Sequence, residues 1–193
     1  MGDDRRFEVL ADFVQRKFPP PLKIADVAGG QGNLSFILTQ KGYDCTVIDP
    51  RKTNLSKKER QISNRKGICF RRVRSKFCSD MAQGFDLIIG LHPDQATEEI
   101  CHAAKFRPTI IVPCCKYWEG IESHGSASLP DTIRKFLKQG EIDWWETLLA
   151  MSGKNLVFVT SPPEPKRNTQ TSGGHNAQAI SRLENTPSGK SVW

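Results

Sequence analysis

The segment that most constrains the fold is a glycine-rich turn between two apolar runs. Residues 23–28 (KIADVA) are mostly apolar, and three glycines fall within the four residues that follow. A helical spacing of apolar side chains over 34–41 then leads to a second apolar run at 44–50 (DCTVIDP). A strand, a tight turn, a helix and another strand in this order predict two parallel strands joined by a helix.

The same alternation continues along the chain. Further apolar runs predict strands at 67–73, 85–91, 108–115 and 155–160, and helical patterns cover 7–17, 94–104, 131–139 and 141–152. The strands are apolar on both faces, which is typical of a parallel sheet with helices on each side. We therefore expect an α/β fold with a doubly wound, mostly parallel, Rossmann-like sheet.

The folded part is expected to end near residue 161. From Pro162 the composition changes to Pro, Ser, Thr, Asn, Gly and Gln, so we expect one domain over 1–161 and a disordered tail over 162–193. No run approaches the ~18 apolar residues of a membrane span, so no membrane is expected as a partner. The first residues lack the apolar region of a secretion signal.

The cysteines indicate the compartment. Six cysteines without a secretion signal suggest free thiols in a reducing compartment. The expected location is the cytoplasm, with the nucleus as the alternative. There is no C-x-x-C or H-x-x-x-H pair, so we expect no metal site and interpret the cysteines as small buried residues.

Two common nucleotide-binding templates do not match the glycine turn. The dehydrogenase pattern G-x-G-x-x-G is met at Gly30 and Gly32, but its third position is Ser35. The phosphate-binding P-loop requires a lysine after its second glycine, and none follows within reach. An NAD enzyme therefore stays the weaker alternative, and phosphate binding is disfavoured.

The pattern that does match is D-x-[GA]-x-G-x-G, formed by Asp26, Ala28, Gly30 and Gly32. Here the sequence resembles the first motif of the Rossmann-like (class I) methyltransferases that use S-adenosylmethionine (SAM). The resemblance implies that glycine lets the backbone approach the cofactor closely and that Asp26 takes up its ammonium group. Asp49 ends the next strand, 23 residues after Asp26. An acid that binds the ribose hydroxyls is expected at this place, about 20 residues after the glycine motif. The neighbouring Gly29, Pro50 and Leu91 complete the expected SAM site.

A second resemblance concerns the ends of the fourth and fifth strands. One branch of the class I methyltransferases carries an H-x-C-G-x-x-[ST]-D stretch after strand four and a Cys-Cys pair after strand five. It includes enzymes that methylate tRNA. His92 and Cys114-Cys115 match that pattern, whereas Pro93-Asp94 departs from it, so the substrate of the branch does not carry over.

Three residues are candidates for catalysis. Methyl transfer needs an oriented nucleophile and often the removal of a proton. His92 and Asp94 are candidate bases or orienting groups, and Lys116 is placed to lower the pKa of a hydroxyl. In the alternative interpretation, His92 and Asp94 only cap the helix that follows. The [DNS]-P-P-[YFW] signature of adenine methylation is absent after strand four, and Cys114 or Cys115 as a covalent nucleophile would follow the wrong strand.

The positive charge is concentrated in one segment. The net charge is +7, yet residues 51–76 alone carry eleven Lys or Arg and one Glu, a local balance of +10. Such a cluster beside the cofactor site favours RNA as the substrate, through its phosphates. The expected RNA contacts are Arg71, Arg72 and Arg74, with Tyr117 and Trp118 stacking an unpaired base.

Other functions remain open at this point. The chain can methylate a protein or a small molecule, with the basic segment as ordinary solvated surface. It can also bind the cofactor without activity and serve a partner as an adaptor. About 160 residues of folded chain leave no separate substrate domain, so a protein partner for substrate recognition is a further expectation.

Overall fold

The computed structural model describes residues 3, 5–114, 118 and 128–163. The helices are α1 (Arg6–Lys17), α2 (Asn33–Gln40), α3 (Lys57–Lys66), α4 (Thr97–Ala103) and α5 (Leu129–Gln139), with short 3-10 helices η1 (Ser79–Gly84) and η2 (Asp94–Ala96). The strands are β1 (Lys23–Val27), β2 (Asp44–Ile48), β3 (Arg71–Val73), β4 (Leu87–Leu91), β5 (Thr109–Val112), β6 (Asp143–Leu148) and β7 (Leu156–Ser161).

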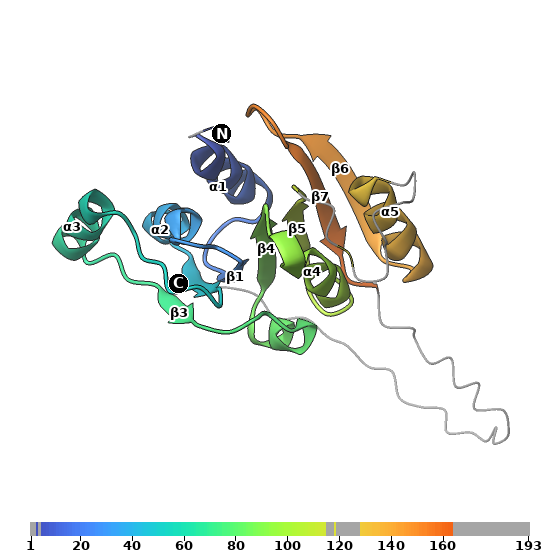
Figure 1. Ribbon diagram of the computed structural model, residues 1–193, viewed down its shortest axis with the longest axis horizontal. Coiled ribbons are helices and arrows are strands. Elements are labelled where there is room, and N and C mark those ends of the chain that lie inside the picture. Colours follow the sequence, from blue (N-terminus) through green and yellow to red (C-terminus); the bar gives the residue numbers. More distant parts are fainter. Residues whose placement is uncertain (1–2, 4, 115–117, 119–127, 164–193) are drawn as a thin grey trace, which may run out of the picture.

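The strands form one sheet in the order β3-β2-β1-β4-β5-β7-β6 (Figure 1). The first five in this order are parallel, whereas β7 runs antiparallel to β5 and to β6. The order reverses next to β1, where the chain crosses from the β1–β3 side to β4. This confirms the predicted α/β fold with a doubly wound, mostly parallel sheet.

One predicted element is wrong. Residues 141–152 were expected to form a helix, but 143–148 form the edge strand β6, which pairs with β7 along its whole length. The apolar side chains Ile142, Trp145 and Leu149 have helical spacing, but only Trp145 lies within the strand, and Ile142 and Leu149 flank it and join different cores. Aromatic residues favour strands, and pairing with β7 decides the outcome.

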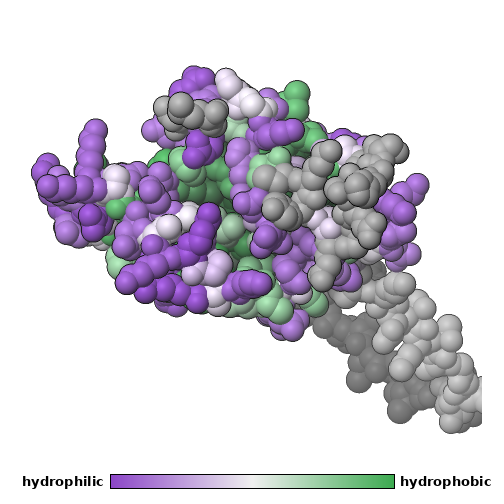
Figure 2. Space-filling view, viewed as in Figure 1, coloured by the Kyte–Doolittle hydropathy of each residue, from purple (hydrophilic) through white to green (hydrophobic). Residues whose placement is uncertain are grey.

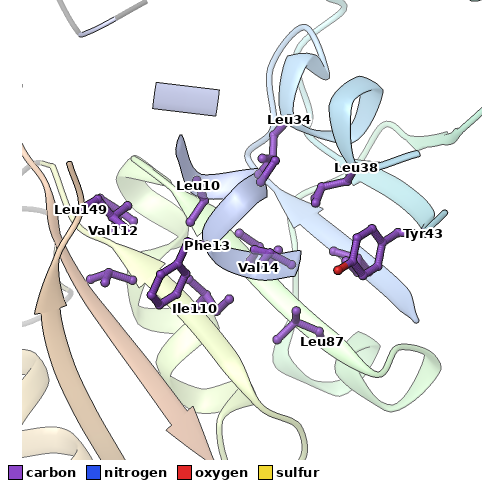
Figure 3. Close-up of a cluster of buried hydrophobic side chains, with 14 of the residues drawn as sticks. Leu10, Phe13, Val14, Leu34, Leu38, Tyr43, Leu87, Ile110, Val112 and Leu149 are labelled. Atoms are coloured by element: carbon purple, nitrogen blue, oxygen red, sulfur yellow. The ribbon is translucent and has the colours of Figure 1, made fainter. Parts of the chain in front are cut away.

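Each face of the sheet carries its own core. On one face, Leu10, Phe13 and Val14 of α1 pack with Leu34 and Leu38 of α2 over the strands (Figure 3). On the other face, α4, α5 and η1 cover the alternate strand residues, among them Ile88 and Ile111. Because neighbouring strand residues point to opposite faces, the continuous apolar runs are what two covered faces require.

Helix α3 differs from the other α-helices because none of its residues is buried. It lies at the β3 edge of the molecule, far from the β6–β7 edge (Figure 1), and the surface at this end is hydrophilic (Figure 2). A capping box between Ser56 and Glu59 starts the helix, and Gly67 in a left-handed conformation ends it. Local capping therefore forms this helix without a core contact.

The last strand ends at Ser161, and residues 164–193 of the expected tail lie outside the described residues. None of the helices that the structure describes is long and apolar enough to cross a membrane. In the same part of the chain, no three His, Cys, Asp or Glu side chains gather as a metal site would require.

Candidate functional site

Two hollows lie at the carboxyl ends of β1, β2 and β4, on either side of Ala28. The first has a volume of about 360 Å³ and is lined by Asp26, the glycine turn, Leu91 and His92, together with Arg6, Phe7, Asn33 and Leu34. The second has a volume of about 400 Å³ and is lined by Asp49, Pro50, Arg51, Phe77 and Asp94, among others. Ala28 lines both hollows. Ligands of open α/β sheets bind at this place, where the strand order reverses.

The glycine turn lies directly over Asp26. A Cβ atom at Gly29 would come within 2.5 Å of the Asp26 Cγ, so a side chain cannot be added without moving the turn. Gly32, the N-cap of α2, has φ = +85°, a conformation that glycine adopts without steric cost. The sequence predicts that the turn needs glycine because its backbone approaches another group closely. At Gly29 that group is the carboxyl of Asp26 itself.

Asp26 is buried, with an exposed fraction of 1%. Its Oδ2 accepts a hydrogen bond from the Ser35 hydroxyl at 2.8 Å. Burial raises the pKa of the Asp26 carboxyl to about 6, although the Ser35 hydroxyl acts in the opposite direction. In the same hollow, the Oδ1 atom of Asn33 is buried without a hydrogen-bond partner in the described structure. Both side chains thus offer oxygen acceptors to a ligand with N–H donors.

Asp49 is also buried, and both its carboxylate oxygens are fully engaged. Oδ1 accepts hydrogen bonds from the Arg51 backbone N–H (2.8 Å) and from Arg51 Nε (3.0 Å). Oδ2 accepts from the Gly30 N–H (2.9 Å) and from Arg51 Nη2 (2.7 Å). Burial alone would raise the pKa of Asp49, but the hydrogen bonds from Arg51 and Gly30 outweigh it and the pKa is lowered. Because a carboxylate has about four acceptor sites, any further donor must displace the Arg51 guanidinium.

Arg72 contacts the glycine turn from the side of β3. Its Nη1 donates to the Gly30 carbonyl at 3.0 Å, and its Nη2 donates to the Gln31 carbonyl. The Thr53 hydroxyl donates to the same Gly30 carbonyl at 2.7 Å. The guanidinium expected to contact RNA is thus already bound to the turn, whereas Arg71 and Arg74 are exposed and keep that expectation.

The two described candidates for catalysis face different hollows. His92 lines the first and Asp94 the second. Both have φ = +55°, which is uncommon outside glycine and often marks a functional loop. The His92 Nε2 lies 2.9 Å from the Lys154 carbonyl in the β6–β7 turn. Neither side chain caps α4, because its N-cap is Ala96, without a side-chain hydrogen bond.

The remaining predicted residues fall into three groups. Leu91 lines the first hollow and Pro50 the second, whereas Gly32 lines neither and instead starts α2. Trp118 packs edge-on against Phe136 of α5, with ring centres 5.4 Å apart. Stacking of an RNA base on the Trp118 ring stays a prediction. Lys116, Tyr117 and Cys115 lie outside the described residues.

Sequence reasoning missed several residues of the site. Arg6 and Phe7 belong to the first turn of α1, and periodicity predicts that helix without showing which strand ends it reaches. Phe77 lines the second hollow from the loop after β3. Phe77 follows Lys76, the last cation of the basic segment, and no pattern in the sequence distinguishes it.

Comparisons with known proteins identify the fold. No protein-family profile matches the chain, and no curated protein matches it. Among solved structures, magnesium protoporphyrin IX methyltransferase from Synechocystis PCC 6803, with bound SAM, has a TM-score of 0.59 at 16% identity, covering 82% of this chain and 79% of that one. The ribosomal protein L11 methylase of Lactobacillus delbrueckii subsp. bulgaricus has a TM-score of 0.51 at 18% identity, with coverages of 82% and 79%.

A third structure is the 1,6-didemethyltoxoflavin-N1-methyltransferase of Burkholderia thailandensis, with bound 1,6-didemethyltoxoflavin and S-adenosylhomocysteine. It has a TM-score of 0.50 at 14% identity, covering 82% of this chain and 77% of that one. These likenesses show that the chain has the fold of the class I SAM-dependent methyltransferases. The specific branch with the Cys-Cys pattern stays a resemblance of sequence.

Proposed function

We propose that this protein is a SAM-dependent methyltransferase. The observation that carries the proposal is the pair of hollows on either side of Ala28, with Asp26 facing one and Asp49 the other. An amino-acid group joined to a nucleoside fits such a divided site. The neighbours with this fold include one solved with bound SAM and one with S-adenosylhomocysteine (SAH), which supports the same cofactor here.

Each end of the cofactor has matching residues. Asp26, which is buried, and Asn33, with its unpartnered oxygen, would hold the ammonium group in the first hollow. Asp49 would accept the ribose hydroxyls in the second hollow, once the Arg51 guanidinium has left it. The apolar side chains of Ile48, Phe77 and Pro93 suit a flat aromatic base. The bound cofactor supplies an electrophilic methyl group attached to sulfur.

His92 is the proposed base or orienting group for the acceptor. Because the Lys154 carbonyl can only accept, the Nε2 atom of His92 carries the hydrogen. In the tautomer with its hydrogen on Nε2, the Nδ1 atom is an acceptor for the proton of a nucleophile. Asp94 and Lys116 stay candidates for the same step, and Asp94 is exposed at the second hollow.

RNA is the proposed methyl acceptor. The basic segment 51–76 begins at Arg51, directly beside the second hollow, and most of its cations are exposed. Among the residues that the structure describes, Arg51 is the one cation of this segment that forms an ion pair. Unpaired surface cations of this density suit a phosphate backbone.

Paired substitutions at the ribose site test the cofactor. We expect Asp49→Ala to lose measurable SAH affinity in calorimetry, because the ribose acceptor is gone. Arg51→Met should instead tighten SAH binding, because the competing guanidinium is removed from Asp49. Equal affinity in the wild type and both variants would contradict the assignment of this pocket.

Radiolabelled methyl transfer into total RNA and total protein tests the acceptor. Counts in RNA that disappear with Asp49→Ala support the proposal. Counts in protein or in small molecules favour the corresponding alternative. The structural neighbours named for magnesium protoporphyrin IX, for ribosomal protein L11 and for 1,6-didemethyltoxoflavin keep these two alternatives open. SAH binding without any transfer would favour the adaptor.

A further inference from the structure

The first hollow is lined by two opposite charges that do not neutralise each other. Asp26 lines it with a buried carboxyl at the end of β1, and Arg6 lines it from the first residue of α1. In the described structure these two side chains form no ion pair, and the carboxyl of Asp26 is instead bonded to Ser35. The charge of Arg72 acts on Asp26 from the other side of the turn, whereas Arg6 forms no ion pair with any residue that the structure describes.

The Arg6 guanidinium is only partly satisfied. Toward the described residues it donates one hydrogen bond, from Nη1 to the Asp3 carbonyl at 3.2 Å, and it lies 4.4 Å from the centre of the Phe7 ring. Arg6 is half-buried, and most of its five N–H donors have no partner among the described residues. A half-buried guanidinium in this state suits a carboxylate, which can accept two of its hydrogen bonds at once.

The start of α1 is anchored beside the hollow. The Asp3 carboxylate accepts hydrogen bonds from the Arg5 N–H (2.9 Å) and from the Ser152 N–H (3.0 Å) in the β6–β7 turn. His92 reaches the Lys154 carbonyl in the same turn. The segment before α1 and the loop after β4 are therefore both hydrogen-bonded to the β6–β7 turn. These bonds hold the start of α1, and with it Arg6, beside the hollow.

We propose that Arg6 binds the carboxylate of the cofactor's amino-acid end, opposite the ammonium held by Asp26. The first hollow is then a site for a zwitterion, with one protein charge for each charge of the ligand. This inference rests on the proposed function, because it assigns a residue to the same cofactor. It also gives Arg6 a role in a hollow where Asp26 is assigned to the ammonium group of the cofactor.

Truncation of the ligand tests Arg6. SAH carries the amino-acid end, and 5′-methylthioadenosine lacks it but keeps the nucleoside. We expect Arg6→Ala to weaken SAH binding in calorimetry by about tenfold to a hundredfold, as for the loss of a charged hydrogen-bonded pair. The affinity for 5′-methylthioadenosine should be unchanged. Arg6→Lys should recover part of the loss, because it restores the charge without the two-pronged geometry.

Arg5→Ala is the matched control. It removes the same charge one residue earlier, from a side chain that is 70% exposed, and it should leave SAH affinity unchanged. If Arg6→Ala and the wild type bind SAH equally, or if the variant loses both ligands alike, the Arg6 assignment is wrong. A wild-type chain that binds neither ligand overturns the proposed function itself. Thermal unfolding of each variant, with Arg6→Lys as the second substitution, separates misfolding from loss of the contact.

Discussion

At the scale of single residues, the site depends on how burial tunes its two acids. The pKa of Asp49 is lowered by its hydrogen bonds despite burial, whereas burial raises the pKa of Asp26 to about 6. Asp49 is therefore ionised throughout the neutral range, and Asp26 exchanges its proton just below it. Only the ionised form of Asp26 attracts an ammonium group.

The cofactor affinity should consequently depend on pH. Below pH 6 the raised pKa keeps Asp26 protonated in the free protein, so binding an ammonium must expel that proton. We expect the Kd for SAH to be flat between pH 7 and 8 and to rise by up to about tenfold per pH unit below 6. Calorimetry across this range measures it. Asp26→Asn should bind weakly and without this slope, and a wild-type Kd constant from pH 7 to 5 would refute the role of Asp26.

Sequence alone locates these acids but not the cations that face them. Asp26 and Asp49 are predictable because each follows a buried strand, and parallel strands end at the same edge of the sheet. Arg51 and Arg72 were counted together as surface charge. The structure instead bonds Arg51 to Asp49 and Arg72 to the glycine turn. Arg72 reaches carbonyls 42 and 41 residues away in the sequence, which no local pattern predicts, whereas Arg51 bonds to an acid only two residues away.

At the scale of elements, the turn between β1 and α2 joins both halves of the site. Its carbonyls bond to Arg72 and Thr53, and its Gly30 N–H bonds to Asp49. Gly29 packs directly on the Asp26 carboxyl. A displacement of this turn would therefore disturb the two acids together.

Gly29→Ala tests the turn as a unit. The added Cβ would lie 2.5 Å from the Asp26 Cγ, so either the turn or the carboxyl must move. We expect SAH affinity to fall by at least about tenfold, because the clash disturbs a packed site without a flexible neighbour. Gly84→Ala is the control, since a Cβ there meets no atom within 4 Å. Unchanged SAH binding in Gly29→Ala would show that the turn does not position the cofactor.

The elements also show where sequence patterns are sufficient. The parallel strands β1, β2, β4 and β5 were predictable because each is a largely apolar run bounded by turn residues, whereas β3 consists of Arg71, Arg72 and Val73. The strand β6 was not, because Trp144 and Trp145 permit helix or strand and only the hydrogen bonds to β7 select the strand. The position of α1 over the first hollow was equally hidden. A helical pattern gives the buried face of α1 but not the strand ends that its first turn reaches.

At the scale of the whole molecule, charge is separated from the core. Residues 1–50 carry a net charge of −1 and residues 77–161 a net charge of −4, so the basic segment stands on a slightly acidic body. Helix α3 carries five cations, and none of its residues is buried. It lies at the hydrophilic end of the molecule in Figure 2. This arrangement gives a cationic surface whose residues can be changed without disturbing the core.

Removal of four exposed cations should therefore weaken RNA binding selectively. Lys57, Lys58, Arg71 and Arg74 are the appropriate set, because Arg72 is needed by the glycine turn. With all four changed to Ala, RNA affinity should fall, and the slope of log K against log salt should flatten by up to about 3 for single-stranded RNA. SAH affinity should not change, because none of the four lines a hollow.

The matched control removes the same charge elsewhere, with Arg16, Lys105, Lys135 and Lys138 changed to Ala, all four being exposed. If net charge alone governs association, both quadruple variants lose RNA affinity equally, and the basic segment is not the docking surface. If only the first variant loses affinity and salt dependence while both still bind SAH, the phosphate backbone lies along α3 and β3. The acceptor then enters from the β3 edge of the sheet, next to the hollow that Asp49 faces.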